Sequence, residues 1–213
     1  MIIVKPSVEV LTRPNRLEVL TLIEYVARIC YKSEDKITAD SCVRIVKSLV
    51  SNQHLAMLEH VSATVKVICD RGVSHELVRH RLASYAQEST RYCNYGHQHE
   101  ITVIKPRFFE EGTPKYNIWR ASCEESERRY MQLLASGATP QEARTVLPNS
   151  LKTEIVMTMN LREWMHFFNL RAIGTTGAPH PQMSEVAEML LKNFAEWLPE
   201  VFGDQYEMLT PRT

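Results

Sequence analysis

Apolar and polar residues alternate along several segments of the chain, a pattern that is typical of β-strands. The segments with this alternation, or with a short apolar run, are Ile2 to Leu11 (interrupted by Pro6), Ala63 to Cys69, Ile101 to Ile104 and Leu151 to Met159. In two of these segments, which are rich in apolar and β-branched residues, the alternation predicts which side chains share one face of the strand. The residues that share a face are Val65, Val67 and Cys69 in one strand, and Leu151, Thr153, Ile155, Met157 and Met159 in the other.

Other segments carry apolar residues at the spacing of an α-helix. The predicted helices run from Arg16 to Cys30, from a cap at Thr38 or Asp40 through Val50, from about Arg71 to Arg81, from Tyr116 to Ser136, from Thr139 to Leu147, from Leu161 to Arg171 and from Pro181 to Leu198. On the first and the fourth of these helices, Leu17 and Ile118 are among the residues expected on the inner face.

Two helix starts have a specific signal. Asp70 is expected to be an N-cap, and Thr139-Pro140-Gln141-Glu142 is a capping box with proline at the first helical position. By contrast, Ser84 to Tyr92 has no clear period and is predicted as a loop or a short helix.

The order of these elements predicts the fold class. Strands and helices mix without a regular βαβ repeat, which favours an α+β fold, with a mixed or antiparallel sheet flanked by helices, over a doubly wound sheet. A chain of 213 residues is long enough for one domain with a sizeable core, so we expect a single domain over residues 1–213. Neither a Gly-x-Gly-x-x-Gly motif nor a P-loop occurs, so no Rossmann motif is expected.

Composition narrows the function classes. Lys plus Arg and Asp plus Glu each number 25, so there is no basic excess to coat a nucleic acid. The five cysteines are scattered without a CxxC pair, which favours a reducing compartment over a disulfide scaffold. No signal peptide and no apolar run long enough to span a bilayer is recognised, so we expect a cytoplasmic protein without a membrane partner.

Hydrogen-bonding side chains are concentrated between Arg79 and Tyr92. Arg79-His80-Arg81 is followed by Ser84, Gln87 and the run Glu88 to Arg91. Cations at a helix C-terminus would explain the first triplet through the helix dipole, but not the polar residues that follow. Because arginine forks suit phosphates and planar heterocycles, this stretch predicts a site for an anionic, nucleotide-like ligand.

Further candidate residues lie outside that stretch. On the helix from Leu161, Arg162 and His166 are four residues apart and share a face. His54 with Glu59 and His60 lack the spacing of known ligand sets. The other tempting cluster is Cys93, His97, His99 and Glu100, but a His-x-His pair on an exposed loop is more often adventitious, so no metal site is predicted. Neither Ser89 nor Cys93 has an evident partnered base, so no nucleophile is predicted. Arg144 is read either as a surface cation or as a further ligand of the anion site.

Together these motifs resemble one enzyme family. Arg79-His80-Arg81, seven residues and then Ser89 resemble the signature of the flavin-dependent thymidylate synthases, and Arg91-Tyr92 also fits it. Further blocks agree in order; they are Ala27 to Tyr31, His54 to His60, Arg144 to Pro148 and Asn160 to Arg171. The resemblance covers roughly residues 25 to 200.

The resemblance implies reductive methylation of dUMP to dTMP, with methylenetetrahydrofolate as carbon donor and NADPH as reductant through FAD. It also implies a homotetramer with active sites between subunits, and no enzyme nucleophile on the pyrimidine. The residues it assigns to dUMP are Glu76, Arg79, Gln87, Glu88, Ser89, Thr90, Arg91, Arg144 and Arg171, of which Arg171 would favour ionisation at N3 of the uracil. Those it assigns to FAD are His54, Ala56, Arg79, His80, Arg81, Gln87, Asn160, Arg162 and His166.

Three positions depart from the family pattern. Ala56 stands where a Ser or Thr is common, Ala86-Gln87 replaces a common Asn-Glu, and Ala178 to Val186 aligns poorly. Two other classes of protein are weighed against the enzyme. A nucleotide- or RNA-binding module would show a steep salt dependence and no flavin, and an oligomeric scaffold with arginine ion pairs would have no affinity for dUMP.

Overall fold

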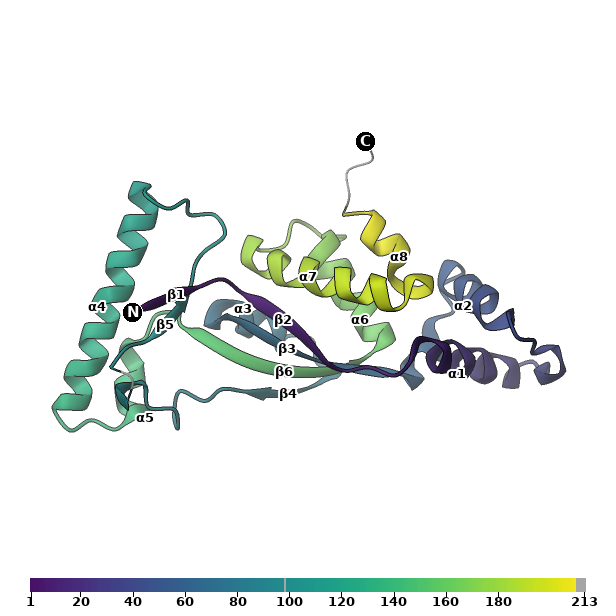
Figure 1. The fold of residues 1–213 in the computed structure, drawn as a ribbon, viewed down its shortest axis with the longest axis horizontal. Coiled ribbons are helices and arrows are strands. Elements are labelled where there is room, and N and C mark those ends of the chain that lie inside the picture. Colours follow the sequence, from purple (N-terminus) through teal and green to yellow (C-terminus); the bar gives the residue numbers. More distant parts are fainter. Residues whose placement is uncertain (98, 210–213) are drawn as a thin grey trace. The chain divides into compact units, whose positions relative to one another are not determined.

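The computed structural model describes residues 1–97 and 99–209, and Figure 1 shows its helices and strands. The strands are β1 (Ile2–Val4), β2 (Ser7–Thr12), β3 (Ser62–Asp70), β4 (Ala83–Gln87), β5 (Thr102–Ile104) and β6 (Lys152–Asn160). The helices are α1 (Arg16–Ile29), α2 (Ser41–Ser51), α3 (Arg71–Leu77), α4 (Pro114–Ala135), α5 (Pro140–Ala143), α6 (Leu161–Phe168), α7 (Pro181–Trp197) and α8 (Pro199–Glu207).

The strands form two sheets. One has the order β2-β3-β6-β4, and the other pairs β1 with β5 in parallel. Val103 of β5 also makes an antiparallel bridge to Leu151, so both pairing directions occur. The α+β fold with mixed sheets flanked by helices is therefore confirmed. None of the helices described has the length and apolar character that crossing a membrane requires.

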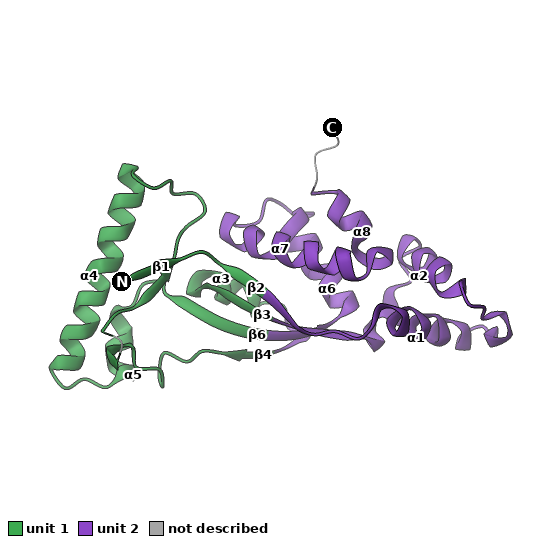
Figure 2. Ribbon diagram, viewed as in Figure 1, with its two compact units in different colours: residues 1–8, 66–80, 85–156 green, residues 9–65, 81–84, 157–213 purple. Residues whose placement is uncertain are grey.

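Contacts between residues divide the chain into two compact units (Figure 2). Unit 1 comprises residues 1–8, 66–80 and 85–156, and unit 2 comprises residues 9–65, 81–84 and the remainder from 157. Each strand of the four-stranded sheet has residues in both units. The expectation of one domain over the whole chain stays a prediction.

Unit 1 has a core between β5, α4 and the start of β6. Ile101, Val103, Cys123 and Leu151 are buried there, and Trp119 packs against them. The inner face of α4 repeats every seven residues through Tyr116, Cys123 and Tyr130, which are all buried. Ile118 lies off this face and is 72% exposed, so its predicted place in the core is wrong.

Unit 2 is built around aromatic side chains of α6, α7 and α8. Phe168 has no exposed surface, and its ring lies 5.3 Å from that of Phe194 and 5.7 Å from those of Trp164 and Phe202. On α1 the buried stripe includes Val19, Leu20 and Ile23, which leaves Leu17 57% exposed. The prediction that Leu17 faces inward is therefore wrong.

Most of the predicted elements are present, with corrections at four places. α3 ends at Leu77 and not at Arg81, and β4 occupies the start of the segment predicted as loop or helix. α5 ends at Ala143, and a 3₁₀ turn follows over Arg144–Val146. α6 ends at Phe168 and continues as a π-helical turn over Asn169–Ile173.

The remaining correction is α8, a helix that the hydrophobic pattern did not predict. The chain breaks from helical geometry at Leu198 (φ −130°, ψ 72°) and restarts with Pro199 at the first helical position. By contrast, all the residues predicted to share one face of β3 and β6 are buried.

The aromatic cluster gives a stability prediction. Phe168→Ala should lower the free energy of unfolding by about 3–5 kcal/mol, because it leaves a cavity among four other rings. Ile118→Ala, at an exposed site on α4, should change it by less than about 0.5 kcal/mol. Urea denaturation of both variants tests this, and equal losses would contradict the packing described.

Candidate functional site

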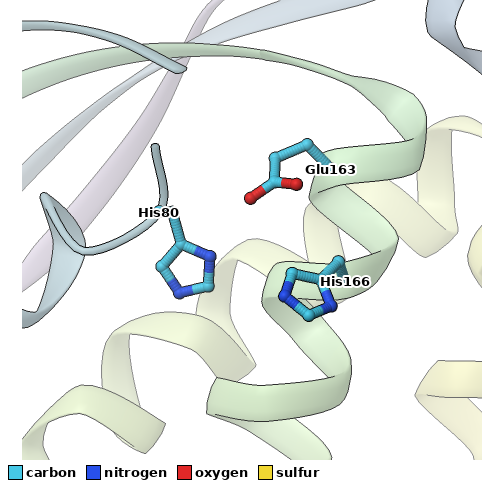
Figure 3. Close-up of side chains that lie close together, drawn as sticks. All are labelled: His80, Glu163 and His166. Atoms are coloured by element: carbon cyan, nitrogen blue, oxygen red, sulfur yellow. The ribbon is translucent and has the colours of Figure 1, made fainter. Parts of the chain in front are cut away.

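The Arg79–Arg81 triplet lies in the turn between α3 and β4. The Tyr85 hydroxyl closes this turn, since it lies 2.8 Å from the Leu77 carbonyl and 2.7 Å from the His80 carbonyl. These carbonyls are thereby satisfied where the helix stops, which accounts for the early end of α3. Arg79 and Arg81 are exposed, whereas His80 (Figure 3) is 5% exposed.

The amide of Gln87 is oriented by two buried hydroxyls of unit 1. Its Nε2 donates to Ser74 Oγ at 2.9 Å and to Thr153 Oγ1 at 3.2 Å. Ser74 Oγ itself donates to the Arg71 carbonyl at 2.9 Å, so only its lone pairs remain for Gln87. The amide nitrogen must therefore point at the hydroxyls, and the oxygen is the atom that Gln87 can offer to a ligand.

Glu88 belongs to a charged network on the same part of unit 1. Lys152 Nζ lies 3.3 Å from Glu88 and 2.6 Å from Glu154, and Lys66 also pairs with Glu154. These bonds lower the pKa of Glu154. Burial lowers the pKa of Lys152, but Glu154 and Glu88 together raise it by more.

Tyr95 completes this network. Its hydroxyl donates to Glu88 at 2.8 Å, and burial followed by the charge of Glu88 raises its pKa. Two cavities of about 350 and 560 Å³ adjoin the network and share Glu88, Cys93 and Lys152 as lining residues. Unit 1 thus offers a polar site with fixed positive and negative charges.

Thr90 and Arg91, at the end of the polar stretch, form hydrogen bonds with residues in and after α5. Arg91 Nε donates to Gln141 Oε1 at 2.9 Å, and Arg144 lies 3.4 Å from the buried Thr90 hydroxyl. Thr139 holds the capping box that starts α5, since its backbone N–H donates to Glu142 at 2.8 Å. Arg91 and Arg144, from distant parts of the sequence, therefore lie close to the hydroxyls of Ser89 and Thr90, an arrangement that suits an anion.

Unit 2 contains a cavity of about 890 Å³ at the start of α6. Asn160 caps this helix, because its Oδ1 accepts from the Glu163 N–H at 2.9 Å. Because the side-chain oxygen of Asn160 accepts this hydrogen bond, its NH₂ group is the part that can donate to a ligand. Arg162, Glu163 and His166 line the same cavity, and Arg162 forms an ion pair with Glu59.

Glu163 and His166 lie three residues apart on α6 (Figure 3). Burial raises the pKa of the Glu163 carboxyl, and the nearby His166 opposes this in part. Glu163 itself is 7% exposed, whereas His166 is exposed. The cavity therefore combines an amide, a guanidinium, an imidazole and a carboxyl with raised pKa.

A second cavity of unit 2, of about 410 Å³, also uses Arg162. His54 and Ala56 line it, together with the Cys30 thiol at the end of α1. Arg162 is thus a lining residue of both cavities, and the predicted residues His54, Ala56, Asn160 and His166 gather around it.

Arg171 lies in the π-helical turn after α6. The Asn169 carbonyl accepts from the Gly174 and Thr175 N–H groups at 2.9 and 3.0 Å. Gly174 has φ +78°, and a Cβ there would meet the Gly177 carbonyl at 2.9 Å, so glycine is required. π-Helical turns are uncommon and frequently occur at functional sites.

Comparisons with known proteins identify the family. The model of the family described as thymidylate synthase complementing protein matches residues 16–200. The chain belongs to the flavin-dependent thymidylate synthase family. A member from Pyrococcus abyssi is 34% identical over 73% of this chain and 66% of its own length. One from Corynebacterium efficiens is 31% identical over 90% and 82%.

A solved structure has the same fold. It is a UMP/dUMP methylase, PolB from Streptomyces cacaoi, bound with 5-Br dUMP. It is 25% identical, with a TM-score of 0.78 over 98% of this chain and 96% of that one. The chain spans about two thirds of the length of the Pyrococcus abyssi family member.

The structure places the predicted residues of the family site in two groups. Unit 1 holds Glu76, Arg79, His80, Gln87, Glu88, Ser89, Thr90, Arg91 and Arg144, and unit 2 holds His54, Ala56, Arg81, Asn160, Arg162, His166 and Arg171. Within unit 1, direct hydrogen bonding connects Thr90 with Arg144. Their roles toward ligands stay predictions.

Sequence reasoning missed several residues of these groups. Ser74 and Thr153 orient Gln87, Lys152 and Tyr95 bind Glu88, and Glu163 lines the large cavity. The motifs gave no signal for them, because serine, threonine and lysine on strands and helices are ordinary. Lys152 and Glu154 alternate with the buried face of β6, which indicates only that they share the other face.

The raised pKa of Glu163 predicts a pH effect on stability. The pKa of the Glu163 carboxyl is higher in the folded protein than in the unfolded chain, so Glu163 lowers the free energy of unfolding least at acidic pH. Stability is lost as the pH rises through the folded-state pKa. Glu163→Gln should therefore gain stability relative to the wild type as the pH rises above the ordinary carboxyl pKa of about 4.3. Thermal unfolding measures this, with Glu196→Gln on the exposed side of α7 as control; a difference that does not change with pH would contradict the assignment.

Proposed function

We propose that the chain catalyses the reductive methylation of dUMP to dTMP, with methylenetetrahydrofolate as carbon donor and NADPH as reductant through FAD. The observation that carries this proposal is family membership over residues 16–200, together with the two groups of polar residues that the fold forms from the family's motifs. Curated relatives named flavin-dependent thymidylate synthase support both the enzyme class and the flavin.

The unit 1 group is proposed to bind dUMP. Ser89 and Thr90, with Arg91 and Arg144, offer hydroxyl and guanidinium donors to the phosphate. Gln87 offers its amide oxygen to a donor on the nucleotide, because its nitrogen is held by Ser74 and Thr153. The other proposed dUMP contacts are Glu76, Arg79, Glu88 and, from unit 2, Arg171.

The unit 2 residues other than Arg171 are proposed to hold FAD, together with Arg79, His80 and Gln87 of unit 1. The donor set fits the group: Arg162 and the NH₂ of Asn160 suit phosphates, hydroxyls and flavin carbonyls, and about 890 Å³ is the size of a cofactor pocket. His54, Ala56, Arg81 and His166 complete the proposed contacts. Bound FAD would supply the hydride transfer that no side chain can perform.

Arg171 is proposed to stabilise the uracil as its N3 anion. A guanidinium stays protonated, so it cannot be the base, but it favours the negative charge that forms. Charged hydrogen bonds of this kind are worth about 1.5–3 kcal/mol. Ser89 then acts as a donor to the nucleotide and not as a nucleophile, in agreement with the absence of a partnered base in its sequence neighbourhood.

The wider arrangement is also proposed from the family. We infer a homotetramer whose active sites lie between subunits, located in the cytoplasm, with no metal. The choice of nucleotide substrate should be measured with UMP as well as dUMP, because the solved structure with the same fold is named a UMP/dUMP methylase.

The direct test supplies purified protein with FAD, NADPH, methylenetetrahydrofolate and dUMP carrying tritium at C5. Tritium release coupled to dTMP formation is expected. UMP in a parallel reaction measures discrimination between the two nucleotides. Tight binding of dUMP without turnover under these conditions would contradict the enzyme and favour a binding module.

Arg171→Ala should lower turnover by at least about 100-fold, because it removes charge stabilisation at the reacting ring. Flavin content should not change, since Arg171 is not among the proposed FAD contacts. Arg171→Lys keeps the charge without the fork and should retain part of the activity. Wild-type dTMP formation by Arg171→Ala would refute the role of Arg171.

A further inference from the structure

The side chain of Gln205 joins α8 to the turn that carries Arg171. Its Nε2 donates to the Met165 carbonyl in the last turn of α6 at 2.9 Å, and to Asn169 Oδ1 at 2.7 Å. Asn169 is the first residue of the π-helical turn. One amide group of α8 therefore spans the junction at which the α-helix becomes a π-helix.

The same turn is fixed at its other end by the backbone. The Asn169 carbonyl accepts the Gly174 and Thr175 N–H groups, and Thr175 Oγ1 lies 3.2 Å from it. Gly174 ends the turn in the left-handed conformation. Asn169 thus receives bonds on both its side chain and its backbone, and Arg171 lies between Asn169 and Gly174 in the turn.

Packing alone does not account for glutamine at position 205. The residue is 6% exposed, and its Oε1 is buried with no hydrogen-bond partner among the described residues. An unpartnered buried amide oxygen costs stability that an apolar side chain of the same size avoids. The two bonds from Nε2 are what distinguishes Gln205 from such a residue.

We propose that Gln205 is a positioning residue that holds Asn169, and through it the π-helical turn, so that Arg171 meets the uracil. The inference rests on the proposed function of Arg171. A guanidinium must be held closely to stabilise charge on a planar ring, and misplacement by about 1 Å can cost up to about 100-fold in rate.

The test uses Gln205→Met in the full chain, since methionine keeps the volume and removes both bonds. The matched control is Glu200→Gln on the same helix, which breaks the part-buried ion pair of Glu200 with Arg16 of α1, a contact that does not involve the turn. Both variants should unfold at lower temperature. Gln205→Met alone should speed amide hydrogen exchange at Gly174 and Thr175, and lower kcat/KM for dUMP about tenfold, with KM for NADPH unchanged.

A double-variant comparison separates positioning from general damage. In the Arg171→Lys background, Gln205→Met should cost little further activity, because it acts through the guanidinium that is already gone. A loss as large as in the wild-type background would overturn the proposal, as would unchanged kcat/KM or equal effects of Gln205→Met and Glu200→Gln. If the wild type does not methylate dUMP, the proposed function fails, and unchanged exchange at Gly174 and Thr175 in Gln205→Met would separately overturn the role of Gln205.

Discussion

Two strands of this fold pass into helices without a loop, and an Asp or Asn cap makes each junction. β3 ends at Asp70, whose Oδ1 accepts the Val73 N–H at 2.7 Å, and β6 ends at Asn160, whose Oδ1 accepts the Glu163 N–H at 2.9 Å. Capping satisfies backbone donors that a helix start leaves open. Because no flexible segment intervenes, each buried strand fixes where its helix begins and where the following polar residues lie.

The two junctions serve different groups of residues. α3 leads to the Arg79–Arg81 turn and to β4, where hydroxyls of α3 and β6 orient Gln87. α6 carries Arg162 and His166 along the large cavity and continues into the turn of Arg171. In the proposed enzyme, each junction therefore supports contacts to both ligands, because Arg79 and Gln87 follow the first and both the flavin contacts of α6 and Arg171 follow the second. Neither junction requires a glycine-rich phosphate loop.

Local patterns predicted the buried strands and two of the caps, Asp70 and the Thr139 capping box, but not the cap at Asn160. Alternation along β6 identified its core face from Leu151 to Met159 because a strand buried on one face has a period of two, and Asp70 was identified because the cap signal is local. The motif residues fall into one polar group in each unit, and their roles toward ligands stay predictions.

Other features depend on contacts that no local pattern reveals. β4 has the weak strand sequence Ala-Ser-Tyr-Ala-Gln and becomes a strand beside β6. α3 stops early because Tyr85 reaches back to the carbonyls of Leu77 and His80. The bonds from Gln205 to Met165 and Asn169 join residues that are 40 and 36 positions apart, so sequence spacing alone gives no hint of them.

The most direct measurement of the central claim is a titration of the purified protein with FAD, followed by visible absorbance. The residues at the start of α6 should give saturable uptake that Arg162→Ala weakens about tenfold or more, as expected for loss of a charged hydrogen bond. Arg120→Ala, which removes an exposed arginine of α4, should leave uptake unchanged. A protein that takes up no flavin, or that binds it equally in both variants, would contradict the account.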